Sequence, residues 1–278
     1  MASIISLAMF GLKPGIDFKG GTLWQIRSAQ ATTDGLAGLL HDDGIKSVTV
    51  FPSADNTYLL RLDNISEEVH QKVLGDLKNK FSDIDELQFE SVGPSIGNET
   101  KQKAYWAIVF VLAGISFYVA FAFRKVSFPI SSWKYGIMTL VSLFHDVVIP
   151  AGFFAVLGWK LGIEIDTNFV VALLVVMGFS VHDTIVVFDR IRENLILRKG
   201  NEAFADTVNR SIVQTLARSV NTSLTVVLVL LAMFFFGPMT LKYFILTLLV
   251  GIVVGTYSSI FLASPLLTIW YKSGKVKS

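Results

Sequence analysis

Residues 168–188 read NFVVALLVVMGFSVHDTIVVF, an almost entirely apolar run that holds one histidine and one aspartate near its end. A helix needs about 20 predominantly apolar residues to cross the hydrocarbon core of a bilayer, and this run meets that length. A charged side chain at the centre of such a helix costs about 2.5–3.5 kcal/mol on insertion scales, so it is rarely kept without a role. The run therefore predicts a membrane-spanning helix and marks Asp183 as a candidate functional residue.

The same pattern recurs along the chain and decides the fold class. Hydrophobic residues make up 52% of the chain and charged residues 17%, whereas soluble domains are about one quarter charged. Four more runs are long and apolar enough to span a bilayer, at residues 104–123, 135–158, 219–237 and 243–271. We therefore expect an α-helical polytopic membrane protein with five full transmembrane helices.

A further apolar run, residues 2–12, is too short to cross a bilayer unaided. A signal peptide is the alternative, but the run lacks a basic n-region and a small-residue cleavage site before Pro14. We expect residues 1–14 to form a shortened first transmembrane helix.

A polar region separates this first run from the next one, because residues 13–103 hold 14 of the 22 Asp and Glu. Alternating apolar and polar residues predict strands, and apolar residues at helical spacing predict helices. The predicted strands are 22–28, 46–51, 58–62 and 87–92, and the predicted helices are 33–41 and 66–81. The order β-α-β-β-α-β is that of the ferredoxin-like fold. We expect an extracytoplasmic α+β domain at residues 15–100 and a five-helix transmembrane domain at residues 101–278.

No pattern in the sequence is typical of an enzyme. The chain has no cysteine, which excludes disulfides, thiolate catalysis and Cys-based metal sites, and it has no phosphate-binding loop. His41 and His70 are isolated, and we expect them to be ordinary surface or capping histidines. The net charge of +2, without a basic cluster, does not favour a nucleic-acid partner. We expect no catalytic site, no metal and no cofactor, and a binding or docking role for the outer domain.

Lysine and arginine in the short loops predict the orientation, because cytoplasmic loops carry an excess of these residues. One side of the membrane carries 12 of them, and the opposite short loops carry only Lys160 and Lys242. The 12 are Arg124, Lys125, Lys134, Arg190, Arg192, Arg198, Lys199, Arg210, Arg218, Lys272, Lys275 and Lys277. We therefore expect both termini in the cytoplasm and residues 15–100 outside it.

Ionisable residues within the apolar runs are the main candidates for function. His145 and Asp146 lie in the middle of the run 135–158, His182 precedes Asp183, and Arg218 borders the run 219–237. A cation beside a buried carboxylate favours its charged form. We expect Asp183 to lie near Arg218 and to exchange a proton for an ion pair, with a change in helix packing. A static polar seam that only holds helices together is the alternative.

Two other features have structural interpretations. Asp189, Arg190, Arg192 and Glu193, at the end of the third full run, are expected to be interfacial charges or a structural salt-bridge cluster. In the last run small residues recur every four positions, which favours close packing of another helix. They are Gly251, Gly255, Ser259 and Ala263.

Two runs of the chain resemble a known family. DFKGGT at residues 17–22 resembles the Asp-Phe-x-Gly-Gly signature of the SecD/SecF protein-export family, and FSVHDTIVVFDRIREN at residues 179–194 resembles the fourth-helix block of its SecF members. The single small outer domain and the chain length are also similar to those of SecF members rather than of the larger SecD members.

The resemblance implies an auxiliary subunit of the cytoplasmic (inner) membrane within the resistance–nodulation–division superfamily, which has six transmembrane helices per subunit. Such a subunit acts with SecD, and uses the proton motive force to promote translocation of preproteins through the SecYEG channel. The family's proton-relay aspartate and arginine fall on Asp183 and Arg218. Its polar third-helix pair falls on His145 and Asp146, and we expect His182 and Asp189 to give further polar support.

The chain departs from the family at its first helix, since Met1 lies only 16 residues before Asp17 where family members carry a complete helix. The signature turn also has a physical interpretation of its own. Gly20 and Gly21 permit positive φ and close backbone approach. We expect the turn formed by Asp17, Phe18, Gly20 and Gly21 to be a structural joint between the membrane and the first strand rather than a ligand site.

The residues alone leave two other functions open. One is a stand-alone, proton-driven exporter of small molecules from the same superfamily. The other is a passive membrane scaffold whose buried charges only hold helices together.

Overall fold

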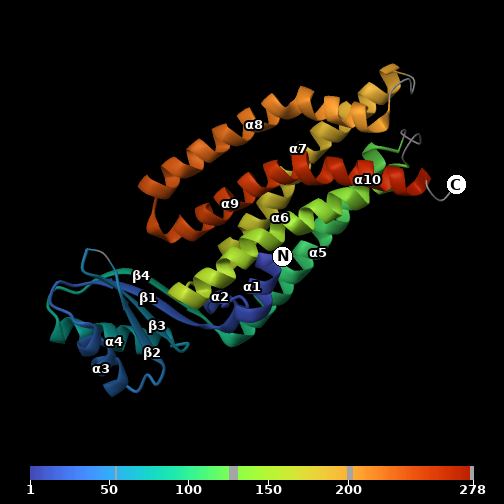
Figure 1. Ribbon diagram of the computed structural model, residues 1–278. Coiled ribbons are helices and arrows are strands. Elements are labelled where there is room, and N and C mark those ends of the chain that lie inside the picture. The colour runs from blue at the N-terminus through green and yellow to red at the C-terminus, as the bar shows by residue number, and fades with distance from the viewer. Residues whose placement is uncertain (54, 125–130, 199–202, 276–278) are drawn as a thin grey trace. The chain divides into compact units, whose positions relative to one another are not determined.

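The computed structural model describes the whole chain except residues 54, 125–130, 199–202 and 276–278. The chain divides into two compact units (Figure 1). The smaller unit is Pro14–Tyr105, and the larger consists of Met1–Lys13 together with Trp106–Ser278.

The smaller unit contains an antiparallel sheet of four strands in the order β2-β3-β1-β4. The strands are β1 (Gly21–Arg27), β2 (Val48–Pro52), β3 (Thr57–Leu62) and β4 (Asp85–Val92). A short helix, α2 (Ile16–Lys19), precedes the sheet, and α3 (Thr33–Asp42) and α4 (Glu67–Lys80) connect its strands. The β-α-β-β-α-β order with this strand arrangement confirms the predicted ferredoxin-like fold.

The core of this unit lies between the sheet and its two long helices. Side chains alternate between the faces of a strand, so Trp24 and Ile26 of β1 lie on the same face as Leu60 and Leu62 of β3. Leucine and valine side chains of α3 and α4 cover that face. The helix starts follow capping rules, since Thr32 and Ser66 each accept a hydrogen bond from a backbone N–H of the first turn.

The two histidines of this unit behave differently. His41 is exposed in the last turn of α3, with Nδ1 3.0 Å from the carbonyl oxygen of Ile45, as expected. The expectation for His70 is wrong, because its ring is buried, 3.6 Å from the ring of Phe89. Its nitrogens contact Glu67 (Nδ1–Oε1 3.2 Å) and Glu86 (Nε2–Oε1 2.9 Å). Helical spacing alone does not reveal that β4 brings Glu86 against α4.

The larger unit is a helix bundle, and its described residues include five helices that are long and apolar enough to cross a membrane. The first four are α5 (Pro94–Ala122), α6 (Ser132–Leu161), α7 (Thr167–Arg198) and α8 (Phe204–Phe236). The fifth is the continuous path of α9 (Lys242–Ser258), η2 (Ser259–Ala263) and α10 (Ser264–Lys275). A short 3-10 turn, η1 (Met239–Leu241), precedes α9. Together with the small sheet, these long helices confirm the predicted fold class. α9 packs against α6, α7 and α8 and so lies at the centre of the bundle (Figure 1).

Helix α8 begins well before the apolar run that predicts it. It starts at Phe204, so Arg218 lies inside the helix rather than at its opening. The first turns carry polar residues at every few positions, and a window chosen for continuous hydrophobicity does not detect them. The backbone is therefore α-helical on both sides of Arg218.

The first helix, α1 (Ala2–Phe10), is short and packs along α6. Gly152 permits the contact, because a Cβ there would lie 2.5 Å from the Cβ of Ser3. Phe10 stacks on Trp159 at 4.5 Å between ring centroids, and the N–H of Ile165 donates to the carbonyl oxygen of Lys13 at 2.8 Å. The shortened helix is thus an integral part of the bundle.

The small-residue stripe of α9 faces α7. A Cβ on Gly251 would lie 2.2 Å from Cγ2 of Val176, and a Cβ on Gly255 would lie 3.0 Å from Cβ of Ser180. Missing Cβ atoms therefore let the two backbones approach closely, which confirms the packing interpretation of these two glycines.

This contact predicts the effect of one added methyl group. Gly251→Ala is expected to lower the stability of the bundle, by about 1–3 kcal/mol if it behaves as ordinary overpacking. Gly178→Ala, in α7, is the matched control because no atom lies within 4 Å of the added Cβ. Thermal unfolding of the two purified variants in detergent tests this, and equal midpoints would contradict the packing argument.

In the smaller unit, Asp83 organises the chain that follows β1. Its carboxylate accepts hydrogen bonds from Ser28 Oγ (2.6 Å), Ala29 N (2.6 Å) and Gln30 N (3.2 Å). These bonds, that of Ser28 above all, hold the pKa of Asp83 below its usual value. A carboxylate with a lowered pKa stabilises the fold above its unfolded pKa, about 3.9, and that stabilisation is lost as pH falls through the folded value.

Replacement of Asp83 by Asn is expected to remove this acid-sensitive contribution. The amides of Ala29 and Gln30 should lose protection from hydrogen exchange at neutral pH, and acidification should then change them little. Exchange measured on the full chain, corrected for the intrinsic pH dependence, tests this. Asp85→Asn is the control, because within the described residues the Asp85 side chain makes only an exposed ion pair with Arg27 at 3.7 Å. Loss of protection in both variants would refute the assignment.

Candidate functional site

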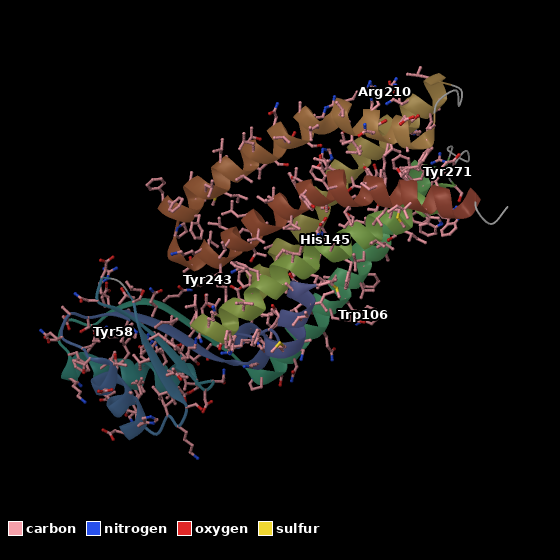
Figure 2. The ribbon with its side chains drawn as sticks, viewed as in Figure 1. Tyr58, Trp106, His145, Arg210, Tyr243 and Tyr271 are labelled. Carbon is pink, nitrogen blue, oxygen red and sulfur yellow. The ribbon has the colours of Figure 1, made fainter. Side chains whose placement is uncertain are left out.

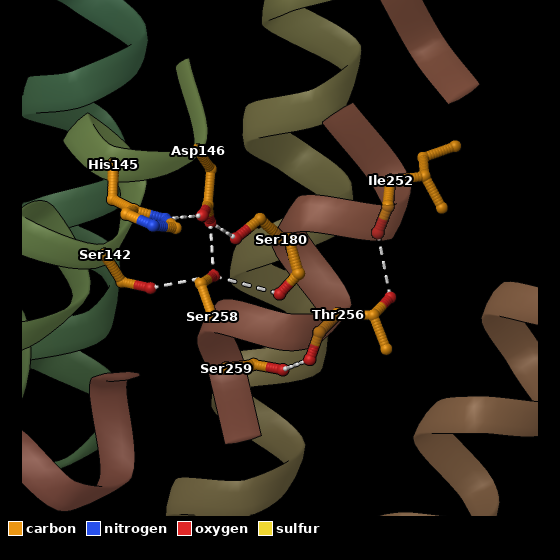
Figure 3. A network of polar contacts seen from close by, with 9 residues as sticks. Ser142, His145, Asp146, Ser180, Ile252, Thr256, Ser258 and Ser259 are labelled. Atoms are coloured by element: carbon orange, nitrogen blue, oxygen red, sulfur yellow. Dashed lines mark hydrogen bonds and ion pairs between the residues drawn. The ribbon is translucent and has the colours of Figure 1, made fainter. Parts of the chain in front are cut away.

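Two aspartates are buried inside the helix bundle, and serine hydroxyls bind both of them. Asp146 has 0% of its surface exposed and Asp183 has 7%. An ionised carboxylate away from water is costly unless hydrogen bonds or a counter-charge compensate it. The groups that surround these carboxylates therefore define the site, and Figure 3 shows those around Asp146.

Asp146 lies about midway along α6, beside His145, which Figure 2 labels within the bundle. His145 Nδ1 lies 2.9 Å from Oδ1 of Asp146. Oδ2 accepts hydrogen bonds from Ser180 of α7 and from Ser258 of α9, the latter at 2.7 Å (Figure 3). Both serines are buried, so Asp146 joins three helices through polar contacts.

Asp183 has a similar environment on α7. Its Oδ1 accepts from Ser219 of α8 and its Oδ2 accepts from Ser259 of η2, each at 2.5 Å. Both serines are almost completely buried. The two carboxylates therefore share the same type of coordination, in which hydroxyl donors come from two neighbouring helical segments.

Arg218 does not occupy the position expected for it. Its side chain is exposed, and no ion pair joins it to Asp183 within the part of the chain that the structure describes. The residue that reaches Asp183 is its neighbour Ser219. Consecutive residues point about 100° apart around an α-helix, so only one of the two can face α7.

Arg218 instead belongs to an exposed polar face of α8. Arg218, Asn221, Thr222 and Thr225 are all exposed and recur at helical spacing; we call them the α8 polar face. His182 of α7 is also exposed. It precedes Asp183 as Arg218 precedes Ser219, and α7 and α8 are antiparallel, so both side chains project from the same side of the helix pair.

The charged residues at the end of α7 form local ion pairs. Asp189 pairs with Arg192 (Oδ1–Nε 3.2 Å), and Arg190 pairs with Glu193 (Nη1–Oε2 2.5 Å). Arg190 also donates to Gln214 of α8 at 2.6 Å. This is the structural salt-bridge cluster that the sequence suggests, and Asp189 lies within it rather than beside the buried carboxylates.

The signature turn forms a close backbone contact in the smaller unit. Gly20 and Gly21 have φ angles of 81° and 132°, as predicted. A Cβ on Gly20 would lie 2.9 Å from Cα of Pro94 at the start of α5, and Phe18 of the same turn is buried. Asp17 and Phe18 lie in the short helix α2, which Gly20 ends. This geometry supports the interpretation of the turn as a structural joint.

Sequence reasoning missed the four serines that bind the carboxylates. Ser259 is part of the small-residue stripe, and the packing argument for that stripe uses only the size of its side chain. Ser180 precedes Asp183 by less than one helical turn, yet it reaches Asp146 on another helix. A serine inside an apolar run is a weak signal, because its hydroxyl can also bond to the backbone of its own helix.

These features define a polytopic membrane protein that holds ionisable groups inside its helix bundle and carries a small α+β unit. Two family descriptions match the chain: "Protein export membrane protein SecD/SecF, C-terminal" over residues 72–273, and "SecD/SecF GG Motif" over residues 5–32. The chain therefore belongs to the SecD/SecF family of protein-export membrane proteins.

Individual relatives agree with this family. Protein translocase subunit SecF of Thermobaculum terrenum is 49% identical over 96% of this chain and 87% of the relative. The SecF subunit of Anaerolinea thermophila is 42% identical with the same coverage. A crystal structure of SecDF from Thermus thermophilus, described as a translocon-associated membrane protein, matches 97% of this chain with a TM-score of 0.82 and 35% identity. The chain covers 36% of that longer protein.

The opposite exposure of Arg218 and Ser219 predicts a difference in reactivity. The native chain contains no cysteine, so an introduced cysteine is its only thiol. In the detergent-solubilised chain, Arg218→Cys is expected to react with a small uncharged maleimide at least about tenfold faster than Ser219→Cys, since Ser219 is only 1% exposed. Mass spectrometry over time measures both rates, and equal rates would contradict the orientation of α8.

Proposed function

We propose that the chain is an auxiliary subunit of the Sec protein-export machinery that acts with a SecD-type subunit. In this proposal it uses the proton motive force to promote movement of preproteins through the SecYEG channel. It performs no catalysis of its own and needs no cofactor other than protons. Membership of the SecD/SecF family, with relatives that are translocase subunits, supports the assignment to protein translocation.

The observation that carries proton coupling is the burial of Asp183 among hydroxyl groups. An ionised Asp183 needs the hydrogen bonds of Ser219 and Ser259, whereas a protonated one needs them less. Protonation therefore changes the balance of forces between α7, α8 and η2. One proton that crosses the membrane potential supplies about 2.3 kcal/mol per 100 mV, comparable with the cost of about 2.5–3.5 kcal/mol for a charge at a helix centre. The energies are sufficient for a proton-driven change in packing.

The α8 polar face supports a partner that lies beside this bundle. Few residues of α8 are buried, yet this face presents Arg218 within a membrane-spanning helix. Ionisable residues in such helices almost always face a bundle interior or pair with a counter-charge. The described residues of this chain offer Arg218 no carboxylate within ion-pair distance. A second helix bundle that offers an acidic group to Arg218 fits this surface.

The excess of basic residues on one side supports a cytoplasmic-membrane protein with both termini in the cytoplasm and residues 15–100 outside it. Most of the twelve residues that give this orientation belong to the described chain, while Lys125, Lys199 and Lys277 lie outside the described residues. A stand-alone exporter is not favoured, since the relatives are translocase subunits.

The proposal predicts the effect of removing the titratable proton from Asp183. Asp183→Asn keeps the size of the side chain and an oxygen that accepts a serine hydrogen bond. We expect the protein to fold, while export that depends on the proton gradient falls to the level of membranes without the chain. Asp189→Asn is the control and is expected to leave export unchanged, since within the described residues the Asp189 side chain makes only an exposed ion pair with Arg192.

Export of a secreted reporter into membrane vesicles, with and without a proton gradient, measures this effect. A folded Asp183→Asn protein that still supports gradient-dependent export would leave the passive scaffold as the better explanation. Purification of the tagged native chain tests the partner. Absence of a SecD-type subunit and of channel components from the gently solubilised preparation would argue against the proposed assembly.

A further inference from the structure

Two neighbouring serines reach the two buried carboxylates from a single peptide segment. Ser258 donates to Asp146 at 2.7 Å, and Ser259 donates to Asp183 at 2.5 Å. Both serines have 0% of their surface exposed. Asp146 and Asp183 belong to different helices, α6 and α7. The Ser258–Ser259 peptide therefore connects two sites that are separate along the chain. Figure 3 shows the two serines and the Asp146 side of this connection.

The segment lies where the helical path changes its form. α9 ends at Ser258, and the π turn η2 begins at Ser259. Single π turns inside α-helices are rare, and those that occur are often found at functional sites. Pro265 follows closely and has no N–H to donate to the helix, while Ser264 Oγ donates to the carbonyl oxygen of Ser259 at 3.1 Å. The regular ladder of α-helical hydrogen bonds is therefore interrupted at this point.

Each of the two hydroxyls has a second acceptor within reach. Ser258 Oγ lies 3.0 Å from the carbonyl oxygen of Gly255, and Ser259 Oγ lies 3.0 Å from that of Thr256. A hydroxyl has one proton, so it donates either to the carboxylate or to the backbone. An ionised carboxylate is the stronger acceptor. A protonated carboxyl can itself donate to the serine oxygen, and the serine proton then turns to the backbone carbonyl.

Other polar groups do not provide the same connection. Ser180 contacts Asp146, and Ser219 contacts Asp183, but neither contacts both. On the elements that pack around the site, the ionisable groups beside it are His145, His182, Arg218 and Tyr257. His145 contacts Asp146. The other three are exposed and contact neither carboxylate within the described residues.

We propose that Ser258 and Ser259 couple the protonation of Asp146 to that of Asp183, so that the two carboxylates respond to protons as one unit. A proton that binds at one carboxylate changes the donor direction of one serine and moves the peptide that carries the other. Asp146 is then a second proton-responsive residue, and the two serines are positioning residues. The inference rests on the proposed function for its role in export, but the coupling itself is a property of the bundle.

Infrared titration of the full chain in lipid vesicles tests the coupling without export. The carboxylic-acid band that disappears in Asp183→Asn reports the protonation of Asp183. Asp146→Asn is expected to move the pH midpoint of this band by about one unit, the interaction at which two sites titrate as a pair. In the Ser258→Ala/Ser259→Ala background, the same Asp146→Asn change should leave the midpoint where it is.

Thr247→Val is the matched control, because it removes a buried hydroxyl of α9 that donates to the backbone carbonyl of Tyr243 and contacts neither carboxylate within the described residues. The effect of Asp146→Asn should persist there. Circular dichroism verifies folding; if the double serine variant does not fold, Ser258→Ala and Ser259→Ala are used singly, since each removes one half of the connection. A shift that survives removal of the serines, or no shift when Asp146 is replaced alone, overturns the proposal. Failure of the export test with a normal titration would overturn only the proposed function.

Discussion

The interior of the bundle is organised by the cost of placing a carboxylate where water cannot reach it. Asp146 and Asp183 are both buried, and each accepts hydrogen bonds from two serines on neighbouring helical segments. Serine hydroxyls are short, so these bonds require close approach of the helix backbones. The glycines of α9 permit that approach toward α7. The hydrogen bonds to the carboxylates thus depend on the tight packing. The serines and the α9 glycines together explain the arrangement.

The sequence reveals most of the architecture because membrane helices and alternating strands have strong periodic signals. The apolar runs predict all five long helices, and the alternation between residues 22 and 92 predicts the order of the sheet domain. Helix ends are less accurate, since the turns that precede Arg218 in α8 are too polar for a hydrophobic window. His70 shows the same limit in the smaller unit, where its burial depends on a glutamate from a distant strand.

The candidate site is only half visible in the sequence. Aspartates inside apolar runs are conspicuous because their cost is high, and this cost marks Asp146 and Asp183 as candidates. The serines that bind them cost little to bury in an apolar helix and show no distinctive spacing. Arg218 was identified for its charge, but its direction depends on which of two neighbouring residues faces α7. Such details follow from how the helices pack, which a single sequence does not give.

The outward direction of Arg218 has a consequence for the assembly of subunits. A copy of the chain that lacks a neighbouring bundle keeps an exposed guanidinium at the proposed cytoplasmic border of the apolar run of α8. A partner that offers a carboxylate at this position would pair with the cation, so the free energy of assembly would include one ion pair. The strength of that assembly would then fall as added salt screens the pair.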